Sequence, residues 1–227
     1  MTFKHKQLFS IIILMLGCAA PVWDASGEKI VYDIDPTGTS TYVDLGVKEI
    51  EGRAVHVSTF HTKVLGFNDT ELIYSDPITF LPLRVERNIS WPLKKEHIIE
   101  SYDQMNFTNT ITKYKKGKVV NEHLIKEDGP IHNAILLPFF LRTIKDIQIG
   151  WSFKLRLLKH FDVTLTSIEE IEVPAGKFKC YHFTSKPPKF EVWITQDELR
   201  IPVKIKGGGF GYTMSMKAYS PSTNVGQ

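Results

Sequence analysis

The sequence predicts a mainly β protein, built as a single curved antiparallel sheet, a β-roll or half-barrel, with one short apolar helix. Two observations predict this fold: apolar and polar residues alternate with a period of two along most of the chain, and turn signals recur about every eight to twelve residues. Hydrophobic residues make up 42% of the sequence and aromatic residues 11%. This composition is enough to build a core and excludes a disordered chain.

The clearest strand is "FGYTMSMKA", residues 210–218, where four large apolar side chains share one face: Phe210, Tyr212, Met214 and Met216. Segments 152–158, 189–195 and 200–206 alternate in the same way. Six earlier segments do so less regularly: 29–35, 53–64, 83–89, 97–103, 107–114 and 118–125. The connections "DPTGT", "FNDT", "KKGK" and "PAGK" supply the turn residues.

One segment, residues 128–144, is too continuously apolar for a half-exposed strand and predicts a short buried helix. Asn133 is suited to cap its start, and Arg142 lies in the last turn, where a cation suits the helix dipole. Because Pro138 has no N–H group, it should kink this helix or restart it.

The N-terminus predicts export. Lys4 and Lys6 precede an apolar run from Leu8 to Leu16, which has the form of a signal peptide and is too short to span a bilayer. Residues 1–27 are then removed by ordinary signal peptidase. In the alternative, "LMLGC" is a lipobox, residues 1–17 are removed and Cys18 is lipidated. Either way we expect a protein of the periplasm or attached to the outer membrane, with residues 28–222 forming a single β domain and residues 223–227 a tail.

Charge and size constrain the possible partners of the exported chain. Removing residues 1–27 takes two Lys and one Asp from the 28 basic and 25 acidic residues, leaving 26 and 24. A balance this close to neutral argues against nucleic acid. Membrane contact is expected only through lipid on Cys18. The basic "KYKKGK", residues 113–118, predicts a solvated hairpin tip, with contact to anionic headgroups as the alternative.

The C-terminal half resembles a known family. The apolar helix that ends in Arg142, then "IGWSFKLRLL", "VPAGKFKCYHF", "FEVWIT" and "LRIPVKI", are similar to the exported bacterial family called domain of unknown function 3108. The resemblance rests on Gly176 in a turn, Trp193 in the following strand and Pro202 before the next one. It implies a mostly antiparallel β-roll or half-barrel and no established activity. The fold itself explains all three residues. Gly176 suits a tight turn that needs a positive φ, Trp193 indicates a strand covered on both faces, and Pro202 suits the first residues or the outer edge of a strand.

The sequence contains no recognisable catalytic motif, so we expect neither an enzyme nor a cofactor or metal. Cys180 and His182 share a strand face, but residues two apart stand about 6.5 to 7 Å from each other, beyond hydrogen-bonding reach, so Cys180 is predicted to fill core space. A hydrolase or transferase with an unrecognised polar site is the alternative. Its clustered candidates are His160, Asp162, Asp197 and Glu198.

The leading functional hypothesis is non-catalytic binding of an apolar or amphipathic envelope ligand, or of a protein partner, in the concave face. The stripe of Phe210, Tyr212, Met214 and Met216 motivates it, because methionine and aromatic side chains line adaptable apolar sites. The other interpretation of the stripe is ordinary core.

Overall fold

The computed structural model describes residues 25–157, 159–207 and 211–222. These residues form fourteen β-strands and one α-helix. In chain order they are β1 (Lys29–Asp35), β2 (Gly38–Ile50), β3 (Arg53–Val64), β4 (Phe67–Ser75), β5 (Pro82–Trp91), β6 (Lys94–Asp103), β7 (Thr108–Lys115), β8 (Lys118–Lys126), α1 (Leu137–Thr143), β9 (Ser152–Arg156), β10 (His160–Val173), β11 (Gly176–Lys186), β12 (Phe190–Thr195), β13 (Pro202–Gly207) and β14 (Thr213–Ser220).

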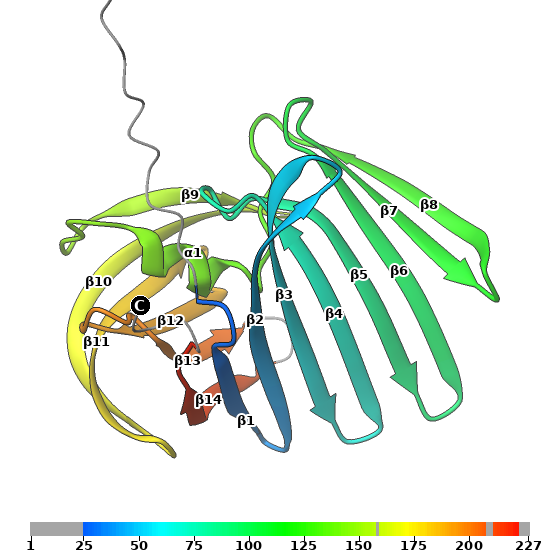
Figure 1. Ribbon diagram of the computed structural model, residues 1–227. Helices are drawn as coiled ribbons and strands as arrows, with labels where there is room; N and C mark the ends of the chain where they lie inside the picture. The colour runs from blue at the N-terminus through cyan, green and yellow to red at the C-terminus, as the bar shows by residue number, and fades with distance from the viewer. Residues whose placement is uncertain (1–24, 158, 208–210, 223–227) are drawn as a thin grey trace, which may run out of the picture.

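All of these strands belong to one antiparallel sheet, in the order β8-β7-β6-β5-β4-β3-β2-β1-β14-β13-β12-β11-β10-β9. The first and last strands therefore pair in the middle of the sheet, and β8 and β9 lie at its two ends. Strands β9–β14 curve around α1, while β2–β8 extend away from it as a broad twisted sheet (Figure 1). The predicted curved antiparallel sheet with one short helix is confirmed.

The core forms on the face of the sheet that α1 covers. Ile34 and Tyr32 of β1 lie opposite Met214 and Met216 of β14, and all four are buried together with Phe139 of the helix. The Phe139 ring stacks on Tyr42 of β2 with 3.7 Å between the ring centroids. The period-two alternation thus buries one face of these central strands.

The helix is shorter than expected, because it begins only at Leu137. Pro138 lies in its first turn, where a missing N–H group removes no helical hydrogen bond. The Asn133 side chain instead closes the turn ahead of the helix, accepting from the N–H groups of Ile135 at 2.8 Å and Leu136 at 3.3 Å. Among the described residues, no helix has the length and apolar character needed to cross a membrane.

One predicted turn is wrong. "FNDT", residues 67–70, is the start of β4, and the chain turns one step earlier, at Leu65 and Gly66, between the paired residues Val64 and Phe67. Gly66 has a φ of +72°, a conformation that glycine adopts at no steric cost. Asn and Asp are typical of turns but also occur in strands that tertiary pairing stabilises.

Strand β12 is covered on both faces. Val192, Trp193, Ile194 and Thr195 are all buried, as expected for a strand with Trp193 on the face opposite its aliphatic residues. Pro202 is the first residue of β13, and its carbonyl accepts from the Tyr32 hydroxyl at 2.8 Å. Gly176 is the first residue of β11, with a φ of +136°.

A buried ion pair ties α1 to the sheet. The Arg142 guanidinium donates two hydrogen bonds to the Glu28 carboxylate, at 2.5 and 2.7 Å, and both side chains are only 2% exposed. The Tyr219 hydroxyl donates to the same carboxylate at 3.0 Å, and Arg142 also donates to the Leu199 carbonyl at 2.9 Å. The pair therefore joins four parts of the chain.

Replacing Arg142 by Met should lower the free energy of unfolding by about 3 to 5 kcal/mol, because Glu28 would be left as a buried charge without its partner. Urea unfolding measures the loss. The matched control is Arg84→Met, which breaks the more exposed pair of Arg84 with Glu86 and should cost less than about 1 kcal/mol. Equal losses in the two variants would contradict this account.

Candidate functional site

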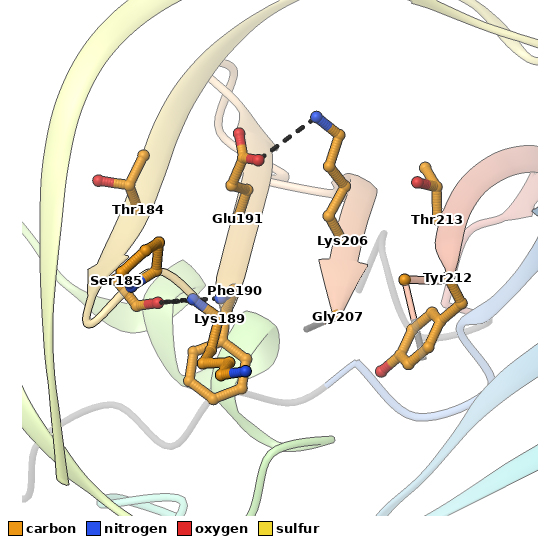
Figure 2. A pocket seen from close by; sticks show the side chains of 11 residues that line it. Thr184, Ser185, Lys189, Phe190, Glu191, Lys206, Gly207, Tyr212 and Thr213 are labelled. Carbon is orange, nitrogen blue, oxygen red and sulfur yellow. Dashed lines mark hydrogen bonds and ion pairs between the residues drawn. The ribbon is translucent and has the colours of Figure 1, made fainter. Parts of the chain in front are cut away.

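A hollow of about 340 Å³ lies where β11, β12, β13 and β14 end, beside the turn that joins β11 to β12. Pockets that hold small ligands have volumes of roughly 300 to 1,000 Å³. We call this hollow the pocket. Its lining combines hydroxyl groups, charged side chains and two aromatic rings (Figure 2).

One wall of the pocket is polar. Thr184, Glu191, Lys206 and Thr213 lie directly opposite one another on four adjacent strands, so that their side chains project to the same side (Figure 2). The Lys206 ammonium is 3.3 Å from one Glu191 oxygen, and the other oxygen is 3.1 Å from Nε2 of His182. This row offers hydroxyls, an ammonium and a carboxylate to a ligand.

The rest of the lining includes Lys189 and the aromatic rings of Phe190 and Tyr212, and both rings extend away from the polar row (Figure 2). The Tyr212 ring lies over the backbone of Gly207: a Cβ atom added there would come within 2.3 Å of the ring. Only glycine at this position lets the ring lie so close. Burial raises the pKa of Tyr212, and the Glu71 carboxylate adds to the shift.

Behind the polar row, His182 and Trp193 stack with 4.2 Å between ring centroids and 7° between ring planes. The indole N–H of Trp193 donates to Glu169 at 2.5 Å. The ammonium groups of Lys204 and Lys206 each lie 5.2 Å from the Trp193 ring centroid, within the range of cation–π attraction. These contacts hold in place the side chains that lie behind the polar wall of the pocket.

Ser185 holds the turn that borders the pocket. Its hydroxyl accepts from the N–H groups of Lys189 and Phe190, both at 2.9 Å, and donates to the Pro187 carbonyl at 3.0 Å. A hydroxyl committed to three backbone groups positions Phe190 and is not free to act as a nucleophile.

The predicted stripe divides between core and pocket. Tyr212 lines the pocket, whereas Met214 and Met216 are buried in the core, 6% and 2% exposed. Phe210 lies outside the described residues, as does Cys18. Of the stripe, Tyr212 is thus the residue that the structure places at a hollow.

Cys180 is fully buried and has no disulfide partner. Burial raises the pKa of its thiol to about 12, so that the reactive thiolate is scarce at neutral pH. His182, the neighbour it would need for a catalytic dyad, is held instead between Glu169 and Glu191.

The polar candidates for a hydrolase do not converge. His160 contacts Glu127 at 2.7 Å, with Asp128 nearby, and not Asp162. These three residues offer ligand atoms within 4.8 Å of one another, but the Arg156 guanidinium already neutralises Asp128 at 2.8 Å.

Asp197, a second member of that candidate set, has a structural place in the turn after β12. Its carboxylate accepts from the Thr195 hydroxyl at 2.7 Å and from the Arg200 N–H group at 3.0 Å. Glu198 is exposed in the same turn. Neither carboxylate is in contact with His160.

The structure contains a Ser-His-Asp array that the sequence did not reveal. Nε2 of His56 lies 2.8 Å from Asp44, and Nδ1 lies 3.3 Å from the Ser75 hydroxyl. All three are buried, with 0% exposure for Ser75 and His56, and the Phe80 ring lies 5.1 Å from the imidazole. A nucleophile must reach its substrate, so this array acts as a buried cross-link between β2, β3 and β4.

A second buried polar group lies on β4 and β5. Burial raises the pKa of the Glu71 carboxyl to about 8, although Arg87 opposes the shift. Arg87 lies 3.5 Å from Glu71 and also pairs with Asp69. An exposed glutamate has a pKa near 4.5. At a pH between about 4.5 and 8, Glu71 therefore takes up a proton when the chain folds.

This uptake makes stability fall as the pH rises from about 4.5 to 8, because the unfolded chain releases the proton earlier than the folded one. Replacing Glu71 by Gln should remove this contribution. We expect the variant to gain about 2 to 4 kcal/mol over the wild type between pH 5 and pH 8, measured by urea unfolding at each pH. A constant difference across this range would show that Glu71 stays ionised.

Cys180 should react slowly with a thiol reagent in the native protein and rapidly after unfolding. Cys180→Ala should cost about 1 to 3 kcal/mol of stability, measured by urea unfolding. Labelling of the native protein within seconds, followed by mass spectrometry of the Cys180 peptide, would contradict the burial described above.

Comparison with known proteins finds two solved structures of low sequence identity and one family model. A β-barrel-like protein of domain of unknown function DUF1849 from Brucella abortus has a TM-score of 0.51 and 10% identity, over 87% of this chain and 98% of that one. A protein with a YmcC-like fold from Bacteroides fragilis has a TM-score of 0.33 and 10% identity, over 87% and 97%. No curated protein is significantly similar. The family model for protein of unknown function (DUF3108) matches residues 32–217, and the chain belongs to this family.

Proposed function

We propose that the chain is an exported, non-catalytic binding protein whose pocket holds an amphipathic ligand of the cell envelope. The pocket between Phe190 and Tyr212 carries this proposal. An amphiphile has an apolar part, which suits the two aromatic rings, and a polar head, which suits the row that contains Glu191 and Lys206.

The distribution of nucleophiles supports binding over catalysis. Ser75 and Cys180 are both 0% exposed, and the Ser185 hydroxyl at the pocket is held by backbone groups. A hydrolase that acted through one of these three groups would need it to reach a substrate.

The N-terminus supports the exported location. Lys4 and Lys6 followed by the apolar run 8–16 have the form of an export signal. Attachment to the membrane through lipid on Cys18 remains the alternative to a free periplasmic protein. The mass of the purified protein distinguishes them, since ordinary processing leaves Glu28 as the first residue.

The test is to purify the protein from a bacterial envelope and measure what remains bound. Native mass spectrometry should show a co-purified amphiphile, and a dansyl-labelled fatty acid should bind saturably. Tyr212→Ala should weaken binding of this probe about tenfold, because it removes one aromatic wall. Gly207→Ala should weaken it as well, because the added methyl group displaces the same ring.

The matched control is Tyr74→Ala, on β4, which removes a half-buried tyrosine away from the pocket. It should leave binding of the probe unchanged. A wild-type protein that carries no amphiphile and shows no saturable binding would reject the proposal.

A further inference from the structure

The order of the strands places alternate turns at the same end of the sheet. In an antiparallel meander, the β1–β2, β3–β4, β5–β6 and β7–β8 turns lie at one end, and the first three follow one another along the lower edge in Figure 1. Asp35 at the end of β1 lies opposite Thr213 at the start of β14, so the pocket lies at this end as well. We call it the pocket end.

Two neighbouring turns at the pocket end expose large apolar side chains. Leu65 is 93% exposed, Leu93 is 101% exposed and Trp91 is 47% exposed. The two turns touch each other, because the Trp91 ring lies 4.6 Å from the Phe67 ring, centroid to centroid. Together Leu65, Phe67, Trp91 and Leu93 form a patch that nothing in the described part of the chain covers, and such patches mark interaction sites.

Exposed lysines surround this patch. They are Lys63, Lys94, Lys95, Lys115, Lys116 and Lys118, which lie in or next to the β3–β4, β5–β6 and β7–β8 turns. The carboxylates beside them are Asp35 and Glu96, and Glu96 is already paired with Lys94 and with Lys113.

Carboxylates predominate in and beside the turns of the opposite end. They are Glu49, Glu51, Asp76, Asp103, Asp197 and Glu198. Fewer cations lie there: they are Lys48, Arg53, Lys177 and Arg200, and Arg53 is paired with Asp76. The chain is therefore close to neutral overall but electrically polarised from one end of the sheet to the other.

We propose that the pocket end docks onto an anionic phospholipid surface. Leu65, Leu93 and Trp91 enter the headgroup region, where tryptophan is favoured, and the lysines contact the lipid phosphates. A second copy of the chain fits this end poorly, because a symmetric dimer would bring the two lysine sets together. The docking goes beyond the proposed function, since it needs no ligand in the pocket.

The test uses vesicles of phosphatidylcholine alone and vesicles of equal parts phosphatidylcholine and phosphatidylglycerol. The full chain should sediment with the anionic vesicles, and salt should weaken this binding. Bromine-labelled lipid should quench the Trp91 fluorescence in the bound protein. Trp91→Phe, which leaves Trp23, Trp151 and the buried Trp193 in the full chain, identifies the quenched signal.

Leu65→Ser and Leu93→Ser should each lower the partition coefficient about tenfold, because each removes an inserted leucine. Lys115→Gln, Lys116→Gln and Lys118→Gln combined should strongly weaken the preference for anionic vesicles, with Lys63, Lys94 and Lys95 still in place. The matched control is Met105→Ser, which removes a 91% exposed side chain in the β6–β7 turn at the opposite end. It should bind as the wild type does.

Equal binding to both kinds of vesicle, or no loss in the two leucine variants, would overturn the proposal. Self-association that Leu93→Ser abolishes, seen by sedimentation without vesicles, would assign the patch to a second copy instead. Tyr212→Ala should dock as the wild type does, so that failure of docking and failure of pocket binding can be told apart.

Discussion

The buried pair of Arg142 with Glu28 holds α1 on the sheet. The helix has seven residues, too few to be stable on its own, and its position depends on its packing and on this pair. The guanidinium also donates to the Leu199 carbonyl, and the carboxylate accepts from Tyr219. The same four groups thus join α1, the start of β1, the β12–β13 connection and β14.

Strand β14, which the ion pair joins to α1 through Tyr219, links the core to the pocket. Strand β14 pairs with β1 on one side and β13 on the other, so it carries Met214 and Met216 into the core and begins at Thr213 in the pocket wall. A change in the curvature of β13 and β14 would therefore move the core methionines and the pocket wall together. The pocket is therefore formed by the ends of β11–β14 together with the residues that connect them.

The sequence was sufficient to predict the fold class because alternation and turn residues act locally. It could not predict which residues the sheet brings together. His56 and Ser75 lie 19 positions apart, and the register of β3 against β4 places them opposite each other. Asp44, which also contacts His56, lies at a register shift of β2 against β3. No local pattern encodes that register.

The same limit applies to the pocket. Tyr212 could be singled out from the stripe, but Thr184, Glu191 and Lys206 come from three different strands, and each is unremarkable in its own segment. They become one wall only because β11, β12 and β13 pair in register. Met214 illustrates the converse: a residue that suits a binding surface by type is core because Ile34 lies opposite it.

The meander also explains how a nearly neutral chain acquires two ends of unlike charge. A turn falls at one end or the other according to its place in the strand order, so basic turns such as "KKGK" and acidic ones such as "TQDE" separate in space though they alternate along the sequence. Net charge hides this separation, because it sums over both ends. Leu65 and Leu93 are exposed at this basic end, and the pocket lies at the same end of the sheet, so that the proposed docking would bring the pocket toward the anionic membrane from which an amphiphile could come.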